Sequence, residues 1–297
     1  MRADNDTQLA ANLTSHVDRL AGLIGPRHLS RPASFAAAAA LVEQELAEAG
    51  YAVERQTYLA GEHEVANIVA ELPGGKKKDE IVIVGAHYDT IETTPGADDN
   101  ASAVAVMIEV ARRMRALQPA RTVRFVGFAC EEPPHFQTGD MGSQVHARQC
   151  RARGERVRGM LCLEMVGYYA TGPGSQEVPP AIPRIFHGVL PKQGDFLAAV
   201  GNLRSVRLLR QFRRGFKRAV RFPLFSIALP EAIREIRFSD NSSFWDQGYP
   251  ALMLTDTSFY RNPHYHLPSD TPDTLDYEAM AQVTLGVVGG TCEVAGV

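Results

Sequence analysis

The chain has 297 residues, of which 45% are hydrophobic and 22% are charged, a composition typical of a globular protein with a sizeable core. Its formal net charge of −3 gives no general reason to expect nucleic acid or an anionic membrane as a partner. The four scattered cysteines contain no CxxC pair, which argues against a disulfide framework and against a cysteine-based zinc site.

The N-terminal part of the chain predicts two helices. Leucine and valine recur at helical spacing over 8–24, and Gly25 with Pro26 ends that helix. A second helix is expected over about 33–48. The first ten residues hold two aspartates and no apolar run, so we expect no signal peptide, no membrane association and a cytoplasmic location.

Short apolar runs then alternate with helical patterns. Segments with strand character at 51–59 and 64–72 precede a turn at 74–79, whose lysines are expected to be exposed. Continuous apolar runs predict buried strands at 81–86, 123–129, 160–166 and 251–256. Helices are expected at about 101–117, 141–152 and 276–290. This alternation predicts an α/β fold, with three αβα layers around a mainly parallel, doubly wound sheet in a single domain over 1–297.

One segment, about 170–240, interrupts the alternation and is expected to form a lid-like insertion. It opens with a loop rich in Pro and Gly and contains a predicted helix at 203–221, where Lys and Arg surround an apolar stripe. The stripe consists of Leu209, Phe212, Phe216 and Val220. We interpret this helix as amphipathic with a solvated basic face. The alternatives are a lid that attracts an acidic substrate or a peptide carboxylate, and a helix that binds a membrane surface.

Histidine and carboxylate side chains follow the predicted buried strands, at the point where each strand ends. They are His87 and Asp89, Asp99, Glu131 and Glu132, Glu164, and His266. Because ligands bind at the carboxyl ends of strands in doubly wound sheets, we expect these side chains to meet at one edge. Zinc takes His nitrogen together with carboxylate oxygen, and a metal there would also offset the cost of burying the carboxylate of Glu164. The sequence therefore predicts a metal centre.

The motifs HYDT, PGADDNASA, FACEE, MGS, LEMVGYY and YHLPSDTPDTLDY resemble those of the zinc aminopeptidases with two co-catalytic metals. That family includes bacterial leucyl aminopeptidases and, more distantly, glutaminyl cyclases. The resemblance covers roughly 64–170 and 238–290, and it implies the zinc exopeptidase fold. It implies two zinc ions per chain, with cobalt or manganese as substitutes, and a peptide or aminoacyl substrate.

The resemblance also implies a role for each residue. The metal ligands would be His87, Asp99, Glu132, Glu164 and His266, with Asp99 bridging both ions. Asp89 would orient the imidazole of His87. Glu131 would act as general base towards a hydroxide that bridges the two zinc ions. We add from the sequence that Tyr265, beside His266, could donate its hydroxyl to the developing oxyanion.

Two positions depart from the family's usual pattern. Glu164 stands where an aspartate is usual when two zinc ions are bound, and its extra methylene would place the second metal differently or weaken its binding. Asn241 stands in SDN where the family has SDH, and it cannot titrate as histidine does. Candidate apolar walls of a substrate pocket are Tyr168, Phe238, Phe244 and Trp245.

The leading hypothesis is a metal-dependent aminopeptidase. A glutaminyl cyclase or another acyl-amide hydrolase, and a carboxypeptidase, are alternatives on the same scaffold. A non-catalytic binding protein would be expected to lack ligands or the base. A two-metal phosphatase or nuclease would be expected to show a Gly-rich phosphate loop or excess basic charge, which the sequence lacks. The sequence leaves the substrate's side chain and the oligomeric state open.

Overall fold

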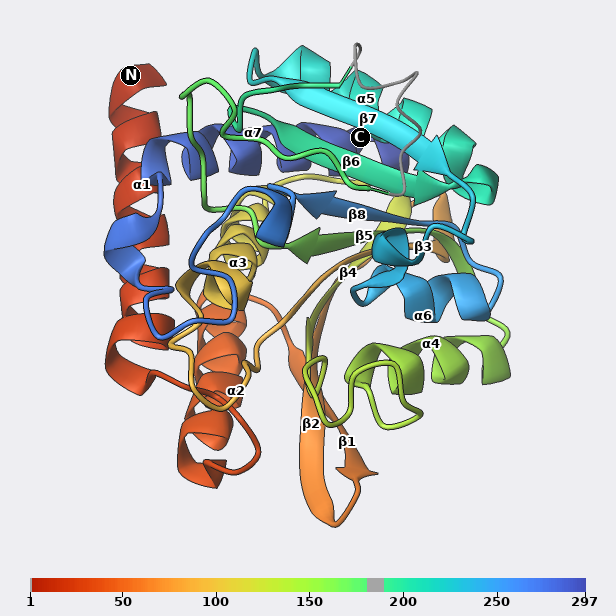
Figure 1. The fold of residues 1–297 in the computed structure, drawn as a ribbon. Coiled ribbons are helices and arrows are strands. Elements are labelled where there is room, and N and C mark those ends of the chain that lie inside the picture. The colour runs from red at the N-terminus through yellow and green to blue at the C-terminus, as the bar shows by residue number, and fades with distance from the viewer. Residues whose placement is uncertain (1, 181–189) are drawn as a thin grey trace.

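The computed structural model describes residues 2–180 and 190–297, which form an eight-stranded sheet with helices on both faces (Figure 1). The strands are β1 (Val53–Ala60), β2 (His63–Leu72), β3 (Lys77–His87), β4 (Arg121–Phe128), β5 (Arg156–Glu164), β6 (Leu197–Asn202), β7 (Leu224–Leu229) and β8 (Ala251–Thr255). The helices are α1 (Arg2–Val17), α2 (Pro32–Glu48), α3 (Ala103–Met114), α4 (Gly142–Ala152), α5 (Val206–Ala219), α6 (Asn241–Asp246) and α7 (Tyr277–Ala295).

The strand order is β1-β2-β4-β3-β5-β8-β6-β7. The central strands β4, β3, β5 and β8 are parallel, whereas β2 pairs antiparallel with β4, and β6 pairs antiparallel with β8. The parallel strands are buried on both faces, as their continuous apolar runs predict. The predicted α/β fold with a mainly parallel sheet is confirmed.

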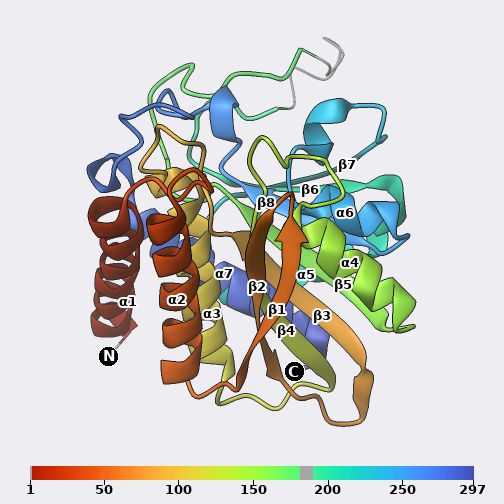
Figure 2. The same ribbon diagram turned by 90° about the horizontal axis from the view of Figure 1, so that it is seen from below.

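The helices divide between the two faces of the sheet (Figure 2). Helices α2, α3, α5 and α7 cover one face, with α1 packed outside on α3 and α7. Helices α4 and α6 cover part of the other face, over a smaller apolar cluster. Within the described residues, none of the helices has the length and apolarity of a membrane span.

The predicted helices and buried strands are present, with small shifts at their ends. The first helix continues beyond α1 through a π-helical segment at Asp18–Ile24. Strand β3 begins at Lys77, inside the predicted turn, and the three lysines of that turn are exposed as expected. All four cysteines are free.

The segment 170–240 differs from the prediction in one respect. Its central part forms β6, α5 and β7, a parallel β-α-β unit that extends the sheet. Helix α5 packs on α7, where a Cβ at Gly286 would lie 2.2 Å from the ring of Phe216. The interpretation of this helix as a lid is therefore wrong, because its apolar stripe is buried against α7. The amphipathic helix with an exposed basic face is confirmed.

Candidate metal centre

The predicted site residues lie at the carboxyl ends of adjacent parallel strands. His87 is the last residue of β3, and Glu164 is the last residue of β5. Glu131 and Glu132 follow β4, the other neighbour of β3. Parallel pairing places these three strand ends side by side, so residues distant in sequence meet at one edge of the sheet.

The first of two side-chain groups brings together His87, Asp99 and Glu164. The Nε2 atom of His87 lies 3.4 Å from Oδ1 of Asp99 and 3.4 Å from Oε2 of Glu164. All three side chains are buried. These three ligand atoms lie close enough together to surround one cation.

The second group brings together Asp99, Glu132 and His266. The Nε2 atom of His266 lies 3.1 Å from Oδ2 of Asp99 and 3.3 Å from Oε1 of Glu132. Asp99 thus directs one carboxylate oxygen to each group. The structure brings together all five residues that the sequence predicts as ligands, and Asp99 is the one member common to both groups.

Three ligand atoms are buried without a hydrogen-bond partner among the described residues: His87 Nε2, Asp99 Oδ1 and Glu132 Oε1. Leaving such an atom unpaired costs about 1–3 kcal/mol, more where the group is charged. A cation between these atoms would satisfy them. The donor set of imidazole nitrogen and carboxylate oxygen is one that zinc accepts, so the residues present fit zinc.

The pKa values of the two histidines show that this region favours positive charge. Burial opposes the charge on His87, but the carboxylates of Glu164 and Glu131 outweigh burial and hold its pKa well above the usual range. Burial likewise opposes the charge on His266, and the close carboxylates of Asp99 and Glu132 raise its pKa to about 10.

The carboxylates respond differently according to their neighbours. Burial opposes the charge on Asp99, but the close imidazoles of His266 and His87 outweigh burial, so the pKa of Asp99 is lowered. Burial and the charge of Asp99 raise the pKa of Glu132 to about 7. Burial also raises the pKa of Glu164. Several carboxylates confined in one buried site need positive charge among them to ionise together.

Glu131 lies beside the two groups without belonging to either. Its Oε2 atom is 3.9 Å from Nε2 of His87. Burial is the main reason that its pKa is well above the usual range, and the charges of Glu132 and Glu164 add to the effect. A carboxyl group next to a cation site is placed to accept a proton and to return it.

Asp89 supports the site mainly through the backbone. Its Oδ1 accepts the amide hydrogen of Glu131 at 3.1 Å, and its Oδ2 accepts that of Glu132 at 3.0 Å. The Nδ1 atom of His87 lies 3.2 Å from the main-chain oxygen of Asp89 and 3.6 Å from its carboxylate. Asp89 therefore holds the backbone of Glu131 and Glu132, and it also faces the imidazole of His87.

Backbone strain also concentrates at the site. Cys130, directly before Glu131, has φ of 59°, and Met165, directly after Glu164, has φ of 46°. His266 itself has φ of 59°. Each left-handed non-glycine residue costs about 1 kcal/mol or more, so the fold keeps these turns to aim the adjacent side chains.

Sequence reasoning missed several residues that hold the ligands. Ser239 donates to Oε2 of Glu164 at 2.6 Å. The carboxylate of Asp270 accepts the amide hydrogens of Asp98 and Asp99 at 2.9 and 3.1 Å. The motifs SDN and HLPSDT contained Ser239 and Asp270, but nothing in the sequence indicated which atoms they contact.

Two further buried groups hold the loops of the site. The side chain of Asp98 accepts the amide hydrogen of Gly167 at 2.8 Å and a hydrogen from Asn262 at 2.7 Å. The guanidinium of Arg27 is fully buried. It donates to the main-chain oxygens of Tyr88 and Gly96, which lie at the two ends of the loop 89–95. Burial lowers the pKa of Arg27 to about 10.

Asn241 lies at the start of α6, and its Nδ2 donates to the main-chain oxygen of Ile236 at 2.9 Å. It is buried.

Tyr265 stacks on His266, with ring centroids 3.8 Å apart and planes at 18°. Burial raises the pKa of Tyr265, so its hydroxyl keeps its proton and remains a donor.

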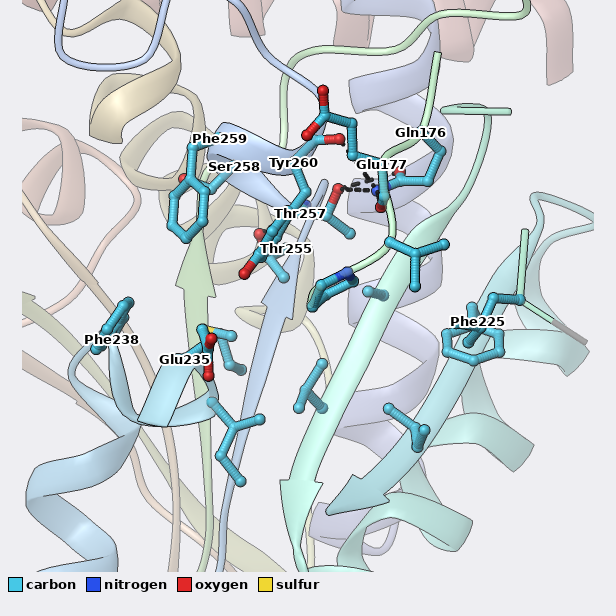
Figure 3. A pocket seen from close by; sticks show the side chains of 18 of the residues that line it. Gln176, Glu177, Phe225, Glu235, Phe238, Thr255, Thr257, Ser258, Phe259 and Tyr260 are labelled. Carbon is cyan, nitrogen blue, oxygen red and sulfur yellow. Dashed lines mark hydrogen bonds between the residues drawn. The ribbon is translucent and has the colours of Figure 1, made fainter. Parts of the chain in front are cut away.

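A largely apolar pocket lies beside the two side-chain groups (Figure 3). Glu164 and Tyr265 belong to its lining. Of the four candidate wall residues, only Phe238 lines it. Phe244 and Trp245 are buried in the smaller core cluster, and the ring of Tyr168 packs against His264.

Comparisons with known proteins agree with this geometry. The family model described as "Peptidase family M28" matches residues 67–289. The chain is 42% identical over 231 residues to "Uncharacterized protein YfbL" of Escherichia coli strain K12, an alignment that covers 75% of this chain and 69% of that protein. It is 29% identical to "Probable leucine aminopeptidase 1" of Trichophyton verrucosum, over 77% of this chain and 58% of that protein.

Solved structures show the same fold. The chain is similar to BSAP, a zinc aminopeptidase from Bacillus subtilis, with a TM-score of 0.73 and 15% identity over 96% of this chain and 94% of that one. At this identity the likeness concerns the fold. The chain spans a little over half the length of the leucine aminopeptidase that it matches.

Proposed function

The chain belongs to peptidase family M28, the zinc metallopeptidases, and we propose that it is a two-metal aminopeptidase that removes N-terminal residues from peptides. The observation that carries the proposal is the pair of side-chain groups that share Asp99. The names of its relatives, leucine aminopeptidase and zinc aminopeptidase, support the direction of cleavage.

His87, Asp99 and Glu164 would hold one zinc ion, and Asp99, Glu132 and His266 would hold the other. When bound, the zinc ions would polarise the scissile carbonyl and lower the pKa of water towards 7. The three carboxylates leave one positive charge from two zinc ions, which a hydroxide would offset. A nearly neutral site of this kind is compatible with its burial.

Glu131 is the proposed general base. Its backbone amide is held by Asp89, so the carboxylate remains fixed beside both groups. It would take a proton from the attacking water and return that proton to the leaving nitrogen of the peptide bond. Its position beside His87, at the edge of the first group, suits both transfers.

Tyr265 is proposed to donate its hydroxyl to the oxygen that becomes negative during the attack. Stacking on His266 fixes the ring next to the second group. The phenol lines the pocket that also reaches Glu164, so a substrate seated there would lie between this donor and the metal ligands.

The test is hydrolysis of leucyl-7-amido-4-methylcoumarin and its N-acetyl counterpart by the purified, zinc-loaded chain. We expect release from the free-amine substrate alone, its loss with chelator and its return with zinc. Glu131→Gln is expected to lower kcat by about 10³-fold or more while zinc content is unchanged. Equal cleavage of the acetylated substrate would contradict an aminopeptidase, and full activity of Glu131→Gln would contradict the role of the base.

A further inference from the structure

The pocket beside the two side-chain groups of the candidate metal centre lies on a part of the sheet that none of the described α-helices covers. Helices α4 and α6 cover this face over the central strands, whereas β6 and β7 have no α-helix on this side among the described elements. Alternate residues of β7, Phe225, Ile227 and Leu229, form the floor together with Val200 of β6 and Met253 of β8. Such a floor is suited to an aliphatic chain.

Several separate segments of the chain surround this floor. Figure 3 shows Glu235 and Phe238 on one side of the strands, Phe225 on the other, and Phe259 and Tyr260 at the end that also holds Thr255 and Thr257. Glu164 and Tyr265 belong to the same lining, so the pocket is continuous with the proposed metal centre.

The charged residues in the described part of the pocket lining are acidic. Besides the ligand Glu164, the described lining contains Glu177 and Glu235, and it contains no Lys, Arg or His. Glu235 is half-buried, and its carboxylate makes no ion pair or hydrogen bond with the described part of the chain. Glu177 is exposed at the rim and its carboxylate is likewise unpaired there.

Among the described residues, the arginines on either side of Glu235 in the sequence do not pair with it. Arg237 forms ion pairs with Glu231 and Asp246, and Arg234 is exposed and outside the lining. Burial raises the pKa of the Tyr260 hydroxyl, and the negative charges of Glu235 and Glu177 raise it further. A half-buried carboxylate among apolar walls favours a cation with an apolar stem.

We propose that this pocket binds the side chain of the substrate's first residue and selects a basic one, lysine or arginine, by pairing its cationic end with Glu235. The aliphatic stem would lie on the floor formed by β6, β7 and β8. This inference rests on the proposed aminopeptidase function. It also predicts discrimination against acidic first residues, because Glu177 and Glu235 would repel them.

The experiment compares kcat/KM for the lysyl, arginyl, norleucyl and glutamyl amides of 7-amino-4-methylcoumarin. Norleucine matches the stem of lysine without its charge. In the wild type we expect the lysyl and arginyl substrates to be cleaved faster than the norleucyl one, and the glutamyl one slowest. Glu235→Gln should lower the lysyl-to-norleucyl ratio about tenfold while norleucyl cleavage changes less than threefold.

Two further variants make the test specific. Glu62→Gln removes the same charge from the exposed tip of the β1–β2 hairpin and should leave every ratio unchanged. Glu235→Lys should reverse the preference, raising glutamyl cleavage relative to lysyl cleavage. Retained norleucyl cleavage in these variants would show that they are folded and hold their metals.

The outcomes separate this inference from the proposed function. If no aminoacyl amide is cleaved, the aminopeptidase itself is refuted. If the amides are cleaved but Glu235→Gln leaves the lysyl-to-norleucyl ratio unchanged, the selection of a basic residue is refuted. If Glu235→Gln lowers cleavage of the lysyl and norleucyl amides equally, Glu235 contacts the α-ammonium group common to both, and the side-chain assignment is refuted.

Discussion

Replacing Ser239 by alanine should weaken one metal position and leave the other nearly unchanged. The Ser239 hydroxyl donates to Oε2 of Glu164, the same oxygen that faces His87. Glu164 belongs to only one of the two groups, and Ser239 contacts no ligand of the second. The substitution therefore removes a hydrogen bond to a proposed ligand of only one of the two metal positions.

The magnitude follows from the kind of hydrogen bond. A hydrogen bond to a charged group contributes about 1.5–3 kcal/mol, and removing such a partner from a metal ligand lowers metal affinity by about 10- to 100-fold. The 2.6 Å distance and the burial of both groups place Ser239 within that range. We expect about a 30-fold loss at the position held by Glu164.

The assay is competition between the protein and a chromophoric zinc chelator, which resolves two successive dissociation constants. Ser243→Ala is the matched control, because Ser243 is also buried but hydrogen-bonds Ser143 instead of a proposed ligand. Unchanged constants in Ser239→Ala, or equal weakening of both sites, would refute the inference that Ser239 supports Glu164 in a separate position.

Further predictions concern the scaffold and its dependence on pH. Gly96→Ala should lower zinc binding at both positions, because the added Cβ would lie 2.2 Å from the main-chain oxygen of Asp99; chelator competition would show this, and unchanged binding would count against it. Arg27→Met should lower the free energy of unfolding by about 4 kcal/mol, since it leaves several buried carbonyl oxygens unpaired; urea unfolding gives the value. Burial, with Arg124, lowers the pKa of His146 to about 3. Its unfolded pKa is about 6.5, so the stability it contributes is present above pH 6.5 and is lost as pH falls towards 3. Between pH 7 and pH 5 the wild type should lose about 2 kcal/mol that His146→Gln retains, and parallel pH profiles would contradict this.

The gathering of these side chains at one edge of the sheet could be predicted, because several of them lie at the end of a recognisable apolar run. His87 and Glu164 are the last residues of buried strands, so the position of the strand also gives the position of the ligand. Asp99 and His266 lie on loops, and the resemblance of their motifs to the zinc aminopeptidases supplied their assignment. The fold followed from the same alternation of apolar runs and helical patterns.

The supporting contacts could not be predicted, because they join residues that are distant in sequence. Ser239 and Glu164 are separated by 75 positions, and Asp270 and Asp99 by 171. Neither local spacing nor residue type indicates such a pair. Strands β6 and β7 were missed because β6 is short and rich in Ala and Gly, and because β7 is half-exposed at the edge of the sheet.

The most direct test of the two-metal centre is anomalous X-ray scattering at the zinc edge from crystals of the zinc-loaded chain. We predict two peaks, one among His87, Asp99 and Glu164 and the other among Asp99, Glu132 and His266. A single peak, or peaks that do not contact both oxygens of Asp99, would contradict the proposed centre.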